Sequence, residues 1–231
     1  ENGAGFCFSC RHVFKQYDTT EVQTDTVRDI KGYQEKSESY SNPKCFGAIS
    51  DRGISKETAQ KYGVQISRTN GGDIARHYYP YYDGTELVGT KVRKVEDKGF
   101  TWIGDAKKGN LFGQHLFSKG GKYLTLVEGE LDALAAYQMQ GSKYPVVSVK
   151  SGSSALKDCK ESYEWIDSFE TIVVCFDGDD VGHKAATQVA ELFGGKTLIV
   201  KHTENYKDAC DYLKYNQQSM FIKNWWQAER Y

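Results

Sequence analysis

Two hydrophobic patterns follow one another along this chain. In the first half, residues 74–82 and 87–95 alternate between apolar and polar positions around an Asp-Gly dipeptide at 83–84, which is typical of a tight β-hairpin. A short helix is expected before the hairpin, because Ser55 is suited to cap its first turn and Gly63 to end it. The first half is therefore predicted to form a small α+β unit.

The second half alternates short apolar runs with segments of helical periodicity. Runs without polar interruption are typical of strands buried on both faces, and helices connect such strands in parallel. We therefore predict an α/β fold with a four-stranded, mainly parallel sheet flanked by helices. The expected strands cover 123–127, 145–149, 171–176 and 197–200, and the expected helices cover 131–140, 154–166, 181–193 and 209–215.

The composition is that of an ordinary soluble domain with no membrane segment. Of the 231 residues, 39% are hydrophobic and 26% are charged. No apolar run approaches the roughly 18 residues that a membrane span needs. The six cysteines are too scattered for a disulfide scaffold, which favours a reducing, cytoplasmic location. Because the sequence starts at Glu1 rather than at Met, we expect a fragment of a longer protein.

The net charge of −1 conceals an uneven distribution of charge. Residues 51–120 carry 12 Lys and Arg against 8 Asp and Glu, whereas residues 121–231 carry 12 against 16. Within the basic region, the second strand of the hairpin places Lys91 and Arg93 on one face. Such a division suits a protein that faces phosphates with one part and holds cations with another, although ordinary surface variation explains the counts equally well.

Acidic residues gather at the ends of two predicted strands. Glu128, Glu130 and Asp132 follow the first strand, and Asp177 and Asp179 follow the third. Ligands of parallel sheets collect at the carboxyl ends of the strands, so these acids are expected to meet. Carboxylates this close repel one another unless a cation lies between them, and oxygen ligands without His or Cys favour Mg²⁺ or Mn²⁺. Capping of helix N-termini is the alternative, but it explains only one Asp per helix.

Two motifs in this region resemble the signature of the Toprim domain. The first is Val-Glu-Gly-Glu-Leu-Asp at 127–132, and the second is Phe-Asp-Gly-Asp-Asp-Val-Gly at 176–182. Together they are similar to a Glu-Gly motif followed by Asp-x-Asp-x-x-Gly. This domain is shared by bacterial-type primases, type IA and type II topoisomerases, recombination mediators and some nucleases.

The flanking segments resemble one Toprim family, the primase half of phage primase-helicases. Arg-Gly-Ile-Ser at 52–55, Lys-Val-Arg at 91–93 and Leu-Phe-Gly at 111–113 precede the sheet in that family's order. Tyr-Pro-Val-Val-Ser at 144–148 and Lys-Asp-Ala at 207–209 are also similar. The resemblance spans nearly the whole chain. It implies a DNA primase that synthesises short RNA primers on single-stranded DNA from ribonucleoside triphosphates, in the host cytoplasm if the protein is phage-encoded.

The resemblance also implies a catalytic site. Glu128, Asp177 and Asp179 would carry the catalytic metal ions, Mg²⁺ or Mn²⁺. Asp132 and Asp208 would be further members of this acidic site. In two-metal nucleotidyl transfer, the ions activate the attacking 3′-hydroxyl and stabilise the leaving pyrophosphate. The spacing leaves open whether Glu128 is a metal ligand or a general base.

Four basic residues are implied in binding the nucleotide or the template. Their charges would neutralise phosphates, although the last of them could equally be an ordinary solvated side chain. They are Arg52, Lys91, Arg93 and Lys98. Thr101 departs from the family, because it stands near the position where a further Lys is expected.

Cys7 and Cys10 are similar to half of the family's zinc ribbon. A tetrahedral zinc site needs four ligands, so Zn²⁺ is expected only if an upstream cysteine pair is supplied. The resemblance further implies two protein partners. One is a helicase domain or replicative helicase, and the other is the replicative DNA polymerase that receives the primer.

These interpretations divide the chain into five segments. The Toprim catalytic domain is the largest, and a basic subdomain of the RNA polymerase core precedes it. The segments are a partial zinc-ribbon remnant at 1–17, a linker at 18–44, the basic subdomain at 45–119, the Toprim domain at 120–215 and a C-terminal tail or linker at 216–231.

Other interpretations stay open at this stage. The tyrosines at 78, 79, 81 and 82 could stack on bases, although packing into a core is favoured for most of them. The chain could also be a primase-like module that has lost synthesis and only guides single-stranded DNA to a helicase, or a Toprim metal-dependent nuclease. A topoisomerase is disfavoured, because its active-site Tyr needs a separate domain for which the chain lacks room.

Overall fold

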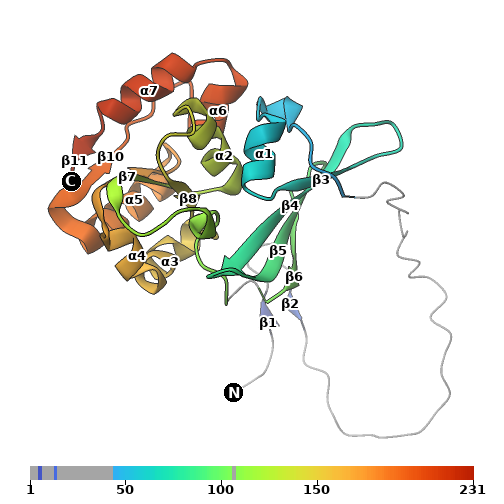
Figure 1. The fold of residues 1–231 in the computed structure, drawn as a ribbon, viewed down its shortest axis with the longest axis horizontal. Coiled ribbons are helices and arrows are strands. Elements are labelled where there is room, and N and C mark those ends of the chain that lie inside the picture. Colours follow the sequence, from blue (N-terminus) through green and yellow to red (C-terminus); the bar gives the residue numbers. More distant parts are fainter. Residues whose placement is uncertain (1–4, 7–12, 15–43, 106–107) are drawn as a thin grey trace, which may run out of the picture. The chain divides into compact units, whose positions relative to one another are not determined.

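The computed structural model describes residues 5–6, 13–14, 44–105 and 108–231 (Figure 1). Strand β1 (Gly5–Phe6) pairs antiparallel with β2 (Val13–Phe14) in the N-terminal of two compact units, which divide between Ser39 and Tyr40. The predicted zinc pair, Cys7 and Cys10, and the predicted linker up to residue 43 lie outside the described residues. The second unit contains the other two sheets.

One sheet of this unit is antiparallel and contains the predicted hairpin. Its strand order is β3-β4-β5-β6, and the hairpin turn holds Gly84 at a φ of 57°, a left-handed conformation that suits glycine. The hydroxyl of Ser55 accepts a hydrogen bond from the backbone N–H of Thr58 and so caps α1 (Lys56–Lys61), as predicted. The strands are β3 (Gln65–Arg68), β4 (Ile74–Asp83), β5 (Glu86–Lys94) and β6 (Phe100–Gly104).

The tyrosines of β4 pack mainly into the core. Tyr79 and Tyr81 are buried, and each lies 5.8 Å from the ring of Phe112. Tyr78 is also buried, whereas Tyr82 is partly exposed and stacks on His115. The core interpretation of these residues is therefore confirmed for all but the last of them.

The other sheet is the predicted parallel sheet with one additional strand. Its order is β11-β10-β9-β7-β8, and the four predicted strands run parallel to one another. The fifth strand pairs antiparallel with β10 at the edge. The strands are β7 (Gly121–Val127), β8 (Val146–Ser148), β9 (Phe169–Cys175), β10 (Thr197–Ile199) and β11 (Glu229–Arg230).

Helices cover both faces of the parallel sheet. One core cluster joins Val127 and Val173 to α2, α6 and α7, and the other joins Leu126 and Val174 to α3, α4 and α5. The α-helices are α2 (Glu130–Met139), α3 (Ala155–Glu161), α4 (Tyr163–Asp167), α5 (Asp180–Phe193), α6 (Ala209–Lys214) and α7 (Gln218–Trp226). Short 3₁₀ helices are η1 (Ser50–Arg52), η3 (Gln114–Leu116), η4 (Gly152–Ser154) and η5 (Gly194–Lys196).

Residues 216–231, predicted to be a tail or linker, instead fold onto the sheet as α7 and β11. Two side chains of α7, Phe221 and Trp225, are buried, and the indole N–H of Trp225 donates to the hydroxyl of Thr125 at 3.0 Å. Burying two large aromatic side chains stabilises the helix by several kcal/mol (about 2 to 3 each), which accounts for its docking. In the described part of the chain, no helix has the length and apolar character to cross a bilayer.

Backbone contacts join the two sheets. Phe112, which follows the antiparallel sheet, exchanges hydrogen bonds of 3.0 and 3.2 Å with Ser148 at the end of β8. The hydroxyl of Tyr62 donates to the carbonyl of Val146 at 2.8 Å. The antiparallel sheet is thereby attached beside the carboxyl end of β8, so that it borders the edge where the predicted acids lie.

Candidate active site

A cleft of about 630 Å³ lies at the carboxyl edge of the parallel sheet. Three neighbouring strands supply its floor, because Glu128 follows β7, Gly152 lies just beyond β8, and Asp177 lies just beyond β9. The antiparallel sheet supplies a basic wall. The charged residues that line the cleft are Glu128, Glu130, Asp132, Asp177, Asp208, Asp211, Arg52, Lys91, Arg93, Lys98, Lys150, Lys207 and Lys214.

Glu128 is partly buried at the end of β7. Its Oε2 atom is buried and has no hydrogen-bond partner among the described residues. Burial raises the pKa of Glu128, and a hydrogen bond with the backbone of Asp177 opposes that rise. The charge of Asp179 raises the pKa further. A buried carboxylate oxygen without a donor is costly to maintain unless a cation or a proton satisfies it.

Asp177 shares this environment. Burial and the neighbouring charge of Glu128 raise its pKa from 3.8 to about 6. The ammonium of Lys207 lies 3.6 Å from Asp177 and 3.7 Å from Asp208, so one cation already lies between these two carboxylates. The exposed side chain of Lys207 is free to be displaced into water, because a surface ion pair contributes little.

Asp132 and Asp208 adjoin the pair. Burial, together with the charges of Asp208 and Asp177, raises the pKa of Asp132 well above its usual range. One oxygen of Asp132 accepts from the backbone N–H of Cys210 at 3.0 Å, and one oxygen of Asp208 caps α6 by accepting from Asp211. In both acids, one carboxylate oxygen therefore accepts a backbone hydrogen bond that stabilises the fold. Their negative charges still add to the repulsion among the acids of the cleft.

Asp179 lies apart from the cleft lining. Its Oδ1 accepts from the backbone N–H of Gly182 at 2.8 Å, which makes Asp179 the N-cap of α5. It is exposed, and it acts on the cleft through its charge on Glu128. Capping of a helix N-terminus therefore explains the positions of Asp179 and Asp208, but it does not explain those of Glu128 and Asp177.

The donor set fits a hard divalent cation. The acids offer carboxylate oxygens, one of them buried and unsatisfied, and burial together with mutual repulsion raises the pKa values of Glu128 and Asp177, a cost that a cation would relieve. Over residues 44–105 and 108–231, however, no three Asp, Glu, His or Cys side chains converge closely enough to enclose an ion. The acids of the cleft are therefore compatible with Mg²⁺ or Mn²⁺ in an open site that substrate oxygens and water complete.

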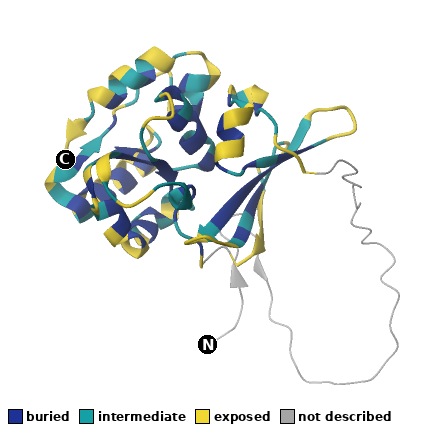
Figure 2. Cartoon of the chain, in the orientation of Figure 1, coloured by how far each residue is buried: buried dark blue, intermediate teal, exposed yellow. Residues whose placement is uncertain are grey.

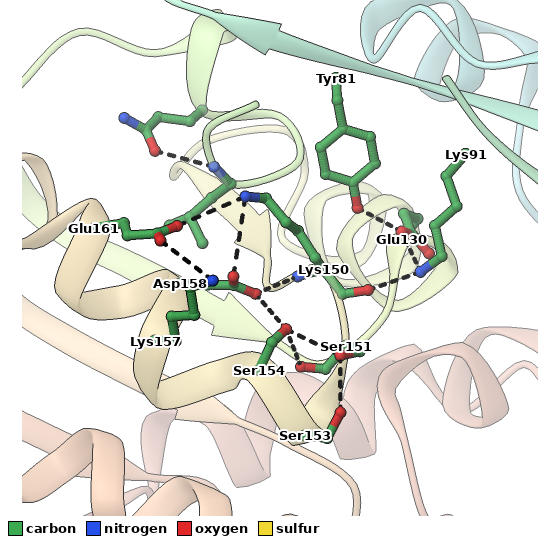
Figure 3. A network of polar contacts seen from close by, with 12 residues as sticks. Tyr81, Lys91, Glu130, Lys150, Ser151, Ser153, Ser154, Lys157, Asp158 and Glu161 are labelled. Atoms are coloured by element: carbon green, nitrogen blue, oxygen red, sulfur yellow. Dashed lines mark hydrogen bonds and ion pairs between the residues drawn. The ribbon is translucent and has the colours of Figure 1, made fainter. Parts of the chain in front are cut away.

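Lys91 belongs to a buried ion pair rather than to an open basic surface (Figure 3). Its ammonium lies 2.8 Å from Oε1 of Glu130, at the first turn of α2, and donates to the carbonyl of Lys150 at 2.8 Å. The hydroxyl of Tyr81 donates to the same Glu130 oxygen at 2.6 Å. Lys91 therefore connects the antiparallel sheet to α2, a role that was not predicted from the sequence.

The other three predicted basic residues also reach the cleft. Arg93 follows Lys91 on the same face of β5, and its Nη1 atom is buried without a hydrogen-bond partner among the described residues. Arg52 pairs with Asp51 at 3.4 Å, and Lys98 is exposed. Among the four predicted phosphate-binding residues, Arg93 is the one with a buried side-chain nitrogen that lacks a hydrogen-bond partner within the described residues.

The loop after β8 completes the floor of the cleft, and it was not among the predicted site segments. Ser154 donates to a carboxylate oxygen of Asp158 at 2.7 Å, and the backbone N–H of Lys150 donates to the same oxygen at 2.8 Å (Figure 3). This network holds Gly152 against Glu128, where a Cβ atom would lie only 2.1 Å from Oε1. The Ser-Gly-Ser-Ser run after an apolar strand was the available signal.

A buried histidine with a testable pH signature lies on β4, directly opposite Arg93 in the strand register. His77 is fully buried, and burial together with the charge of Arg93 lowers its pKa from 6.5 to about 4. The unfolded chain therefore binds a proton at a higher pH than the folded chain, so stability falls as the pH drops through this window.

A His77→Phe variant is expected to lose less stability than the parent when the pH is lowered from about 6.5 to about 4. Urea unfolding at several pH values across this window measures the difference. The carboxylates that titrate in this pH range are the same in both proteins, so their contributions to the free energy of unfolding cancel in the comparison. Parallel stability curves for the two proteins would contradict the assignment.

Comparisons with known proteins define the class of this fold. The Toprim-like family matches residues 125–213. The DNA helicase/primase of Enterobacteria phage T3 is 38% identical over 204 residues, which is 86% of this chain and 36% of that protein. The chain therefore spans about a third of this relative's length.

Two solved structures agree over most of the chain. The primase fragment of the bacteriophage T7 primase-helicase has a TM-score of 0.71 at 31% identity, covering 96% of this chain and 90% of that one. A primase domain in a complex with bacteriophage T7 lagging-strand DNA polymerase has a TM-score of 0.73 at 35% identity, covering 82% and 95%. The chain belongs to the Toprim-type DNA primases, in the family of phage primase-helicases.

Proposed function

We propose that this chain synthesises short RNA primers on single-stranded DNA from ribonucleoside triphosphates. The observation that carries the proposal is the unsatisfied buried oxygen of Glu128 beside Asp177, facing a wall that includes Arg93. Acids that repel one another on one side and cations on the other suit a polyanionic substrate bound with a metal ion. Membership of the primase family supports the same conclusion.

Mg²⁺, or Mn²⁺ in its place, is the proposed cofactor. We propose Glu128 and Asp177 as its principal holders, with Asp132, Asp208 and Asp179 contributing the surrounding negative charge. When bound, such an ion lowers the pKa of an attacking hydroxyl and stabilises a leaving pyrophosphate. Lys207 would leave its position between the acids when the ion enters.

The basic residues would hold the phosphates. The guanidinium of Arg93 is the proposed main contact, because Arg93 lines the cleft and its Nη1 atom has no hydrogen-bond partner among the described residues. Arg52 and Lys98 line the same cleft and would add charge. Lys91 acts chiefly by keeping the wall attached to α2, and only secondarily through its own charge.

A primer-synthesis assay tests the proposal. The chain is incubated with Mg²⁺ or Mn²⁺, all four ribonucleotides and single-stranded templates of varied sequence, and labelled RNA products are resolved by length. Templated short RNA that requires the metal is expected. Cleavage of labelled DNA without nucleotides would instead identify a nuclease, and DNA binding without either reaction would identify a silent module.

A Gly152→Ala variant is expected to lower primer synthesis about a hundredfold, because misplacing a reacting group by about 1 Å has effects of this size. The added Cβ would meet Oε1 of Glu128 at 2.1 Å and force that side chain away from Asp177. Kinetic assays and thermal unfolding of the variant measure the effect. Ser153→Ala, an exposed change in the same loop, is the control. Full activity of the Gly152 variant would exclude a role for Glu128 in its present position.

The remaining partners rest on the family. We propose that the chain works beside a helicase domain and hands its primers to a replicative DNA polymerase, since the relatives are named as a helicase/primase and as primase domains interacting with a polymerase. We propose the host cytoplasm as its location. Zinc binding by Cys7 and Cys10 is proposed only together with a further cysteine pair.

A further inference from the structure

The edge strand β6 presents two aromatic side chains beside the cleft. Phe100 is 51% exposed and Trp102 is 42% exposed, which is unusual for such large apolar groups. The whole of β6 has the colour of exposed residues in Figure 2. In the strand register, Phe100 lies opposite Arg93 and Trp102 lies opposite Lys91. Directly paired residues point to the same face of a sheet, so both rings share the face whose Lys91 and Arg93 line the cleft.

Both rings contact side chains of the neighbouring strands. Trp102 contacts Tyr81 edge to face, with ring centroids 5.2 Å apart. The ammonium of Lys91 lies 4.7 Å from the centre of the Phe100 ring. Each ring is therefore fixed on its inner side and exposed on its outer side. A fixed aromatic surface binds a flat partner with little further loss of side-chain entropy.

Charge indicates what that partner is. Arg93, opposite Phe100, has a buried and unpartnered Nη1 among the described residues, and the exposed Lys98 lies two residues before Phe100. A flat apolar surface flanked by cations suits an occupant with flat faces and phosphates. Single strands of nucleic acid are bound in this way, by base stacking on aromatic rings and by cations that follow the backbone.

We propose that Phe100 and Trp102 form a base-stacking platform that holds single-stranded DNA as it enters the cleft. The proposal deepens the proposed function and rests on it.

The test compares DNA binding by matched variants of the full 231-residue chain. Fluorescence anisotropy with a labelled oligo(dT) of about 12 nucleotides reports the affinity. Trp102→Ala is expected to weaken binding about five- to hundredfold, whereas Trp102→Phe retains most of it. The control is Ile103→Ala, since Ile103 is equally apolar and 54% exposed on the opposite face.

Salt dependence separates stacking from charge. Trp102→Ala is expected to lower the affinity at every salt concentration without changing the slope of log affinity against log salt. Lys98→Ala is expected to reduce that slope by about 0.7, the value for one phosphate contact of a single strand. Thermal unfolding of each variant shows that the fold is intact.

Equal binding by the parent, Trp102→Ala and Ile103→Ala proteins, with primer synthesis still present, would overturn the platform and leave the proposed function standing. Failure of the parent chain to bind any single-stranded DNA or to make primers would overturn both. Loss of binding in Trp102→Ala and Ile103→Ala alike would also overturn the platform, because it would assign the effect to the strand as a whole.

Discussion

Replacing Asp177 with Asn is expected to reduce primer synthesis at least about a thousandfold, since a metal ligand supplies several kcal/mol of transition-state stabilisation. The fold is expected to persist. Burial and the charge of Glu128 raise the pKa of Asp177 to about 6, so removing its charge relieves repulsion in the metal-free protein. Its lost pair with the exposed Lys207 is a small term. Steady-state synthesis rates and thermal unfolding without metal measure the two effects.

The matched control for this change is Asp180→Asn. Asp180 is an exposed acid three residues further on, at the first position of α5, and it does not line the cleft. It is expected to retain synthesis within about twofold, because surface substitutions away from special features change energies by about 0.5 kcal/mol or less. Equal losses in both variants would remove the distinction between cleft acids and surface acids on which the site depends.

Replacing Lys91 with Ala is expected to lower the free energy of unfolding by about 3–5 kcal/mol. The change leaves the buried carboxylate of Glu130 without its cation, which lies 2.8 Å away in the parent, and removes the hydrogen bond to the carbonyl of Lys150. Both side chains of the ion pair are largely buried, so water cannot compensate. Urea unfolding of the variant and the parent measures the difference.

A double-mutant cycle identifies the cause. Lys91→Met combined with Glu130→Gln removes both charges and is expected to recover most of the lost stability, since a neutral pair leaves no buried charge unpaired. Lys98→Ala, at an exposed cation, is expected to change stability by at most about 0.5 kcal/mol. A Lys91→Ala protein as stable as the Lys98→Ala protein would refute the structural role of Lys91.

The sequence alone supports most of the fold through its periodicity. The apolar runs predict the four parallel strands, and Ser55 and Gly63 predict the ends of α1. Three short strands of the second unit were not predicted, because β3 has four residues, β11 has two and β6 is exposed on both faces, which removes any alternation. The spacing of Phe221 and Trp225, one helical turn apart, could have revealed α7.

Only that part of the acidic site can be predicted from the sequence which follows from the ends of neighbouring parallel strands. Placing acids after neighbouring parallel strands correctly brings Glu128 and Asp177 to one cleft. Helix capping was one interpretation of these acids, but the pattern did not single out Asp179 as the residue whose oxygen caps α5. The partner of Lys91 is 39 residues away, and Gly152 meets Glu128 across the chain, so neither contact leaves a local spacing signal.

Binding of Mn²⁺ to the full chain, followed by electron paramagnetic resonance, tests the proposed metal site most directly. If the cleft acids hold the ion, the parent and Asp180→Asn proteins bind Mn²⁺ alike, whereas Glu128→Gln and Asp177→Asn bind it at least about tenfold more weakly. Identical Mn²⁺ affinity in all four proteins would contradict the site.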